Sequence, residues 1–125
     1  MTARQIIDKV NDIKPNAFTD AAKLKWLNEL EGRIAAKIFL MAPAEIKQAE
    51  LSLTDTPMVE PPYDNMYVFW LEARIDEANG EYDRYQNSMQ MFDSAWREFL
   101  CWFGQTWDPA QGYINEERRR EYGAL

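Results

Sequence analysis

The feature of this sequence that most constrains its fold is an unbroken apolar stripe in its second half. From Leu71 to Phe103, apolar and aromatic residues recur at alternating gaps of four and three positions. This spacing places every member on one face of an α-helix, as in a heptad repeat. The members are Leu71, Ile75, Ala78, Tyr82, Tyr85, Met89, Phe92, Trp96, Phe99 and Phe103. The stripe therefore predicts that this half of the chain is helical.

The pair Asn79-Gly80 lies in the middle of the stripe and has the composition of a turn. Two interpretations are open: a helical hairpin that turns at this pair, or one long helix kinked at Gly80. The stripe keeps its phase across the pair, which a hairpin loop has no reason to preserve. We therefore expect one helix from Asp64, its N-cap, to about Gly104, roughly 60 Å long at 1.5 Å per residue.

Two shorter amphipathic helices are expected before it. The first begins at Thr2, whose spacing to Gln5 is that of a capping box. The second begins at Thr19 or Asp20, where an acid complements the helix dipole, and ends before Pro43. Their apolar faces consist of Ile6, Val10 and Ile13, and of Leu27, Leu30, Ile34 and Ile38. The expected fold is all-α, a small bundle built on the long helix.

The lengths of these helices predict an oligomer. Helices of about 18 and 30 Å cannot cover the whole stripe of a helix of about 60 Å together with its neighbouring tryptophans. A surplus of aromatic surface normally marks an interface. Gly32, inside the second helix, costs about 1 kcal/mol relative to alanine. It is either tolerated there or allows another helix to approach closely.

The helical period fades between Ala42 and Pro62. Pro43 can begin a short helix, and the alternation from Leu51 to Thr54 predicts a short strand. The segment is either a connecting loop packed on the bundle or an arm that reaches a neighbouring subunit. In the second case its candidate partner-binding residues are Leu51, Leu53, Met58 and Val59.

We divide the chain into a helical domain, residues 1–104, and a C-terminal tail, residues 105–125. The tail should contain a short polar helix from Glu116 to Tyr122 that carries three consecutive arginines. These arginines are a solvated mixed-charge face, a contact to a protein, or a contact to nucleic acid phosphates. The candidate partner-binding residues of the tail are Trp107, Tyr113, Arg118, Arg119, Arg120 and Tyr122.

The sequence offers little for catalysis. It contains no histidine, and its net charge of −7 disfavours nonspecific binding to nucleic acid or anionic membranes. The single Cys101 lies among apolar neighbours and is expected to be buried and reduced. The paired carboxylates worth testing as a site are each four apart and face the same way on a helix (Glu72 with Asp76, Glu77 with Glu81), and no two acids are three apart. We therefore expect no enzyme, no metal and no cofactor.

No apolar run is long enough to span a membrane, and the N-terminal segment lacks the apolar stretch of a cleaved signal. We therefore expect a soluble protein with no membrane partner.

Two stretches of the chain form a recognisable pattern. They are Leu27-Asn28-Glu29-Leu30-Glu31-Gly32-Arg33-Ile34, and Pro62-Tyr63-Asp64, Tyr67, Leu71-Glu72-Ala73-Arg74-Ile75-Asp76, Asn79-Gly80-Glu81-Tyr82, Tyr85-Gln86-Asn87-Ser88 and Phe92-Asp93. Together they resemble a family of small helical proteins, the head–tail connector (adaptor or neck) proteins of tailed phages and prophages of Gram-positive bacteria. The resemblance covers roughly residues 1 to 104. Trp70, Trp96, Trp102, Trp107 and the arginine-rich tail have no counterpart in that pattern.

The resemblance implies a virion structural protein that is made in the host cytoplasm and assembles into a homo-oligomeric ring. Such a ring joins the portal to a tail-side neck protein, and packaged DNA passes through its channel without specific binding. The family has no catalytic residues to carry over. The alternative from another class is a small acidic phage-encoded inhibitor that binds a host protein.

Overall fold

The computed structural model describes the backbone of residues 1–48, 50–108 and 112–113, and the side chains of residues 1–47 and 50–104. In order along the chain, these residues form α1 (Ala3–Ile13), α2 (Asp20–Lys37), α3 (Pro43–Gln48), α4 (Asn65–Ala78) and α5 (Tyr82–Thr106). Two-residue strands β1 (Trp107–Asp108) and β2 (Gly112–Tyr113) pair antiparallel after α5. The predicted all-α fold is confirmed.

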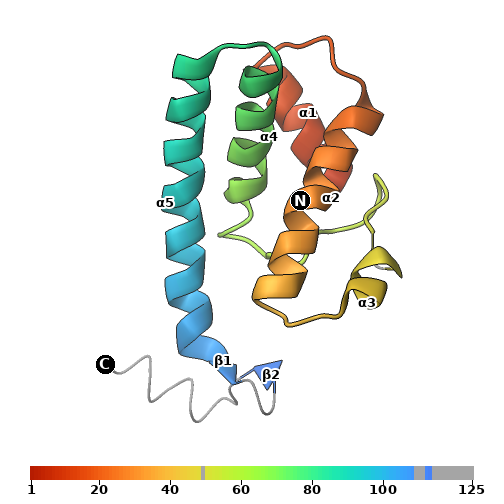
Figure 1. Cartoon of the computed structure of the whole chain (residues 1–125), viewed down its shortest axis with the longest axis vertical. Coiled ribbons are helices and arrows are strands. Elements are labelled where there is room, and N and C mark those ends of the chain that lie inside the picture. The colour runs from red at the N-terminus through yellow and green to blue at the C-terminus, as the bar shows by residue number, and fades with distance from the viewer. Residues whose placement is uncertain (49, 109–111, 114–125) are drawn as a thin grey trace.

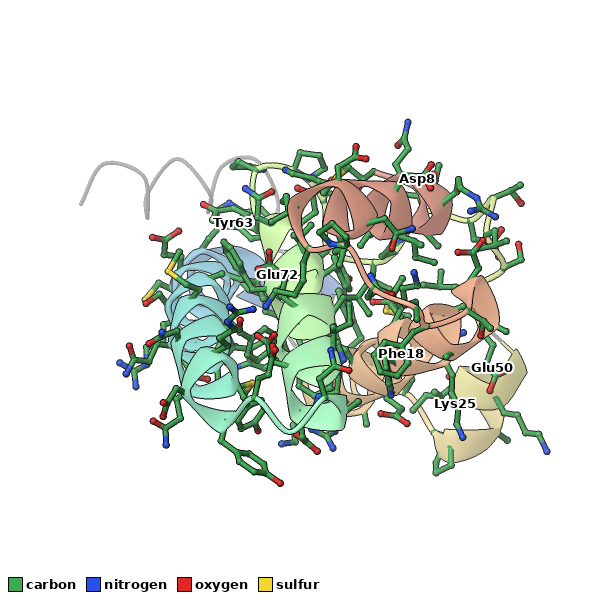
Figure 2. The ribbon with its side chains drawn as sticks, turned by 90° about the horizontal axis from the view of Figure 1, so that it is seen from above. Asp8, Phe18, Lys25, Glu50, Tyr63 and Glu72 are labelled. Atoms are coloured by element: carbon green, nitrogen blue, oxygen red, sulfur yellow. The ribbon has the colours of Figure 1, made fainter. Side chains whose placement is uncertain are left out.

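The helix α4 lies at the centre of the molecule. It packs on α5 at one side and on α1 and α2 at the other, and α3 packs on α2 (Figures 1 and 2). The interior between these helices is mostly apolar, with Ile6, Val10, Leu27, Ile34, Tyr67, Leu71, Ile75 and Phe99 fully or nearly fully buried. Lys23 adds a polar tie between α2 and α1, because its Nζ donates to Asn11 Oδ1 at 2.6 Å.

The prediction of one long helix is wrong. The chain turns at residues 79–81, and α5 runs back antiparallel along α4, as Figure 1 shows. Gly80 has a left-handed φ of 73°. Its amide donates to Glu77 O, and the amide of Glu81 donates to Asp76 O. These two hydrogen bonds are those of a Schellman motif, which ends a helix at a residue with positive φ.

The stripe kept its phase across the turn only because Ala78 and Tyr82 are apolar or aromatic, and both are exposed. The core members of the stripe belong to two separate faces. Leu71 and Ile75 belong to α4, whereas Phe92 and Phe99 lie on the face of α5 that packs against it. The two helices therefore cover much of each other's apolar surface. The argument for an oligomer depended on the length of a continuous helix. Because that helix does not form, this argument no longer holds.

The capping predictions for the first two helices are confirmed. Thr2 and Gln5 form the capping box of α1. The side chain of Thr19 accepts from the amide of Ala22 at the start of α2. Pro43 occupies the first position of α3, as expected. Asp64 precedes α4 but forms no side-chain cap; its carboxylate instead accepts from the amino group of Met1.

Candidate protein-interaction surfaces

The segment from residue 50 to residue 62 is held by hydrogen bonds to the helices of the same chain. The first two amides of α1 have no partners inside that helix, and they donate to the carbonyls of Asp55 and Leu53. The side chain of Asn28 on α2 binds Leu51 twice, accepting from its amide at 2.8 Å and donating to its carbonyl at 3.2 Å. No strand forms at residues 51–54, so that prediction is wrong. The alternation instead marks an extended segment whose leucines face inward.

A buried carboxylate holds the second half of this segment. Glu31 is 5% exposed. One carboxylate oxygen accepts from Tyr67 Oη at 2.6 Å, and the other accepts from the Met58 amide at 2.7 Å. The same tyrosine oxygen accepts from the Val59 amide. Desolvation raises the pKa of Glu31, although both hydrogen bonds oppose the rise, and burial also raises the pKa of Tyr67.

These contacts place the candidate residues of the arm inside the monomer. Leu51 and Val59 are buried, Leu53 packs against the core, and Met58 is half-buried. In this conformation Leu51 and Val59 offer no free surface to a neighbour. The structure matches the alternative of a connecting loop packed on the bundle.

The structure does not bring the candidate partner-binding residues of the tail together with those of the segment between residues 42 and 62. Trp107 and Tyr113 are register partners in the β1–β2 pairing, which is defined by their backbones alone. Arg118, Arg119, Arg120 and Tyr122 lie outside the described residues.

The carboxylate pairs have separate surroundings. Asp76 is fully buried, and both of its oxygens accept from Lys14 Nζ at the end of α1. Ser88 on α5 donates a third hydrogen bond to it, so the group joins three helices. Glu72, labelled on α4 in Figure 2, is half-buried, and desolvation raises its pKa. Within the part of the chain that the structure describes, no group of three His, Cys, Asp or Glu residues could hold a metal ion.

A groove opens between α2 and α5 above the indole of Trp70. Trp70 is held in place because its Nε1 donates to Trp26 O at 2.9 Å. The ring centroids of Trp70 and Phe92 are 5.3 Å apart, and those of Phe92 and Trp96 are 6.0 Å apart. The groove has a volume of about 180 Å³ and is lined by Leu30, Arg33, Lys37, Trp70, Phe92, Asp93 and Trp96. We call this set the α2–α5 groove.

A second exposed feature is the turn between α4 and α5, residues 79–83, which we call the hairpin tip. It lies at one end of the long axis of the molecule (Figure 1). All five residues are exposed, and Tyr82 keeps 66% of its surface in solvent. Glu81 and Asp83 flank this tyrosine directly. Arg84, the next residue, is also exposed, and its Nη1 lies 3.4 Å from Glu81 Oε2. The tip therefore presents an aromatic ring with an acidic residue before and after it in the sequence, the first of them paired with Arg84.

The thiol of Cys101 is exposed rather than buried, because α5 turns this residue away from α4. Among the described helices, none combines the length and apolar character needed to cross a membrane.

Comparison with known proteins identifies no relative: the sequence matches no family model and no curated protein, and the fold matches no solved structure.

Sequence reasoning did not identify either surface feature. In the sequence, Tyr82 is a member of the apolar stripe, and this membership conceals the tip. The groove left two signals in the sequence: the spacing of Arg33 and Lys37, four apart on one helical face, and the tryptophans Trp70 and Trp96 outside the family pattern. Only the packing of α2 beside α5 brings these signals together.

Proposed function

We propose that this chain is a structural subunit of a phage virion rather than an enzyme. It acts as a head–tail connector, assembling into a ring beneath the portal and joining the portal to a tail-side neck protein. Its site of action is the neck of the virion, and assembly takes place in the host cytoplasm.

The observation that supports this proposal is the resemblance to connector proteins, because its residues form the framework of the fold. The first matched stretch lies in α2 and the second runs through α4, the turn and α5. The two stretches meet at the buried hydrogen bond between Glu31 and Tyr67. Within the second stretch, Ser88 on α5 donates to the buried carboxylate of Asp76 on α4. Gly80, also in the matched pattern, supplies the positive φ of the turn. Residues that determine packing are those that proteins with a common fold share.

The acidity of the chain gains a role in this proposal. The chain carries 21 acidic and 14 basic residues. A ring of acidic subunits produces a channel of negative potential, which repels phosphates. Packaged DNA then passes through the channel without binding to its wall.

The experiment that tests the proposal is co-sedimentation of the purified chain with portal-containing, DNA-filled heads. We expect the wild-type chain to sediment with heads and not with portal-free capsids of the same phage. A variant lacking residues 113–125 should keep its fold, because the described core lies within residues 3–103. We expect it to lose attachment, since the tail carries the candidate docking residues.

Circular dichroism and thermal melts of the truncated variant report the fold separately from the docking. If the wild-type chain does not associate with portal-containing heads, the connector function is refuted. If the truncated chain sediments as wild type does, the tail is not the anchor, and the connector function stands on another surface.

A further inference from the structure

The α2–α5 groove has a definite chemical preference. Its floor is apolar, formed by Leu30, Trp70 and Phe92, which are all nearly fully buried. Its volume of about 180 Å³ is comparable to that of an engineered cavity of about 150 Å³ that accommodates a benzene ring. The floor therefore suits one aromatic side chain.

The rim of the groove is cationic although the chain as a whole is acidic. Arg33 and Lys37 lie one helical turn apart on α2, both exposed, and Asp93 on α5 is the single acid among the lining residues. Arg33 also lies over the Trp70 ring, with its Cζ 5.4 Å from the centroid. Such a rim attracts carboxylates next to the aromatic group that enters the floor. A matching partner presents an aromatic ring between acidic residues.

The hairpin tip of the same chain has this chemistry. Tyr82 is an exposed aromatic ring, and Glu81 and Asp83 precede and follow it in the sequence. Glu81 also pairs with Arg84 at 3.4 Å, which leaves Asp83 as the acid nearest Tyr82 with no ion pair among the described residues. The tip is also rigid, because the Schellman hydrogen bonds fix the turn and α5 begins at Tyr82. A rigid aromatic anchor binds with little loss of conformational entropy.

The tip cannot enter the groove of its own chain. Tyr82 and Phe92 lie on one continuous helix, which holds them about 15 Å apart along its axis at 1.5 Å per residue. The tip and the groove can therefore meet only between two copies of the chain.

We propose that the hairpin tip of one subunit docks into the α2–α5 groove of the next, with Tyr82 over the aromatic floor and its flanking carboxylates at Arg33 and Lys37. This inference rests on the proposed function, in which copies of the chain form a ring, and it names the contact that joins them. Because tip and groove are different surfaces, the contact is heterologous, and repeating it generates a closed ring when the rotation permits.

The test is the self-association of full-length variants, measured by sedimentation velocity over a range of concentrations. Tyr82→Ala removes the anchor, and Lys37→Glu reverses the charge of the rim. We expect each to weaken association about tenfold or more, as the loss of a central aromatic or charged anchor does at an interface. Met91→Ala is the matched control, because Met91 is an exposed residue of α5, 53% accessible, outside both the tip and the groove.

Mixing the two variants tests the direction of the contact. The Lys37→Glu chain keeps its tip, and the Tyr82→Ala chain keeps its groove, so one intact contact remains per pair. We expect the mixture to form dimers, and nothing larger, at concentrations at which each variant alone is monomeric. The double variant Lys37→Glu with Asp83→Lys restores opposite charges at the contact and should recover part of the association.

Two results overturn the inference. One is a wild-type chain that remains monomeric at its highest soluble concentration. The other is association of Tyr82→Ala or Lys37→Glu equal to that of wild type and Met91→Ala. Co-sedimentation with portal-containing heads tests the connector function separately, because that assay depends on docking to the portal. A variant chain that still co-sediments with heads but shows no change in self-association overturns the subunit contact alone. Far-ultraviolet circular dichroism of each variant establishes that its fold is intact.

Discussion

Substitution of glycine by alanine should have opposite effects on stability at two positions of this fold. Gly32 lies inside α2 with helical backbone, and a Cβ built there meets Ile46 Cγ2 at 3.6 Å, an ordinary van der Waals distance. Gly80 has a φ of 73°, which an alanine adopts only under strain, although nothing lies within 4 Å of its Cβ position. The two substitutions add the same methyl group, so they differ mainly in backbone conformation.

The magnitudes follow from the backbone. Gly32→Ala should raise the free energy of unfolding by about 1 kcal/mol, because alanine restricts the unfolded chain and favours the helix. For a domain of this size that is a rise in Tm of roughly 4 °C. Gly80→Ala should lower the free energy of unfolding by about 1 kcal/mol, because left-handed backbone costs an alanine roughly 1–2 kcal/mol. The restricted unfolded state offsets part of this cost.

Urea denaturation followed by far-ultraviolet circular dichroism measures both changes. Gly104→Ala in α5 is the matched control, because no atom lies within 4 Å of its Cβ position and the change reports helix propensity alone. Destabilisation by Gly32→Ala would mean that α3 approaches α2 more closely than the contact to Ile46 allows. A neutral or stabilising Gly80→Ala would refute the turn, since a continuous helix gains stability from alanine at that position.

Three further outcomes are expected. Lys14→Ala should lower the free energy of unfolding by about 3 kcal/mol in chemical denaturation, because it leaves the buried carboxylate of Asp76 without its cation. Lys9→Ala, on the exposed side of α1, is the control and should change the free energy of unfolding by less than about 0.5 kcal/mol. Glu31→Gln tests the raised pKa of Glu31. The folded state holds the Glu31 proton more tightly than the unfolded state, so the stability of the wild type relative to this variant should be greatest below pH 4.5. This difference in the free energy of unfolding should fall as the pH rises from 4.5 through the pKa of Glu31 in the folded state. Unfolding curves of both proteins at several pH values measure the difference. A difference that grows with pH would contradict the burial of Glu31. Cys101 should react with a thiol reagent in the native protein as fast as in urea, and protection of the native thiol would show that α5 is rotated from its described position.

The local parts of the fold were predictable because their causes lie within a few residues. The capping box of Thr2 and Gln5, the cap at Thr19 and the start of α3 at Pro43 each depend on backbone groups one turn away. The end of α2 is bounded only loosely by Pro43. The helix stops at Lys37, before the proline that was expected to end it, and Leu40 beyond it adopts a positive φ of 56°.

The hairpin was missed because one global pattern was weighted above one local signal. Asn79-Gly80 has the composition of a turn, but the unbroken spacing of the stripe favoured a continuous helix. Spacing alone cannot tell a buried position from an exposed apolar one, and Ala78 and Tyr82 are exposed. The α2–α5 groove depends on Trp70 and Trp96, which come together only after the chain turns back.

The cationic rim of the α2–α5 groove could not be predicted from the sequence for a different reason. Arg33 and Lys37 define a cationic edge only relative to the aromatic residues beside them. Those residues belong to helices that begin at residues 65 and 82, far along the chain. Periodicity within one helix carries no information about which helix it will meet.

The position of the turn at Gly80 also has a consequence for folding: we expect α4 and α5 to pair first. The most extensive helix–helix interface is that of α4 with α5, and only residues 79–81 separate these helices. Closing so short a loop has a small entropic cost, so contacts across it form early. The N-terminal helix α1 meets α4 across a sequence separation of more than 50 residues, as in the pair of Lys14 and Asp76. Substitutions inside the hairpin should therefore slow folding, whereas those on α1 should mainly accelerate unfolding.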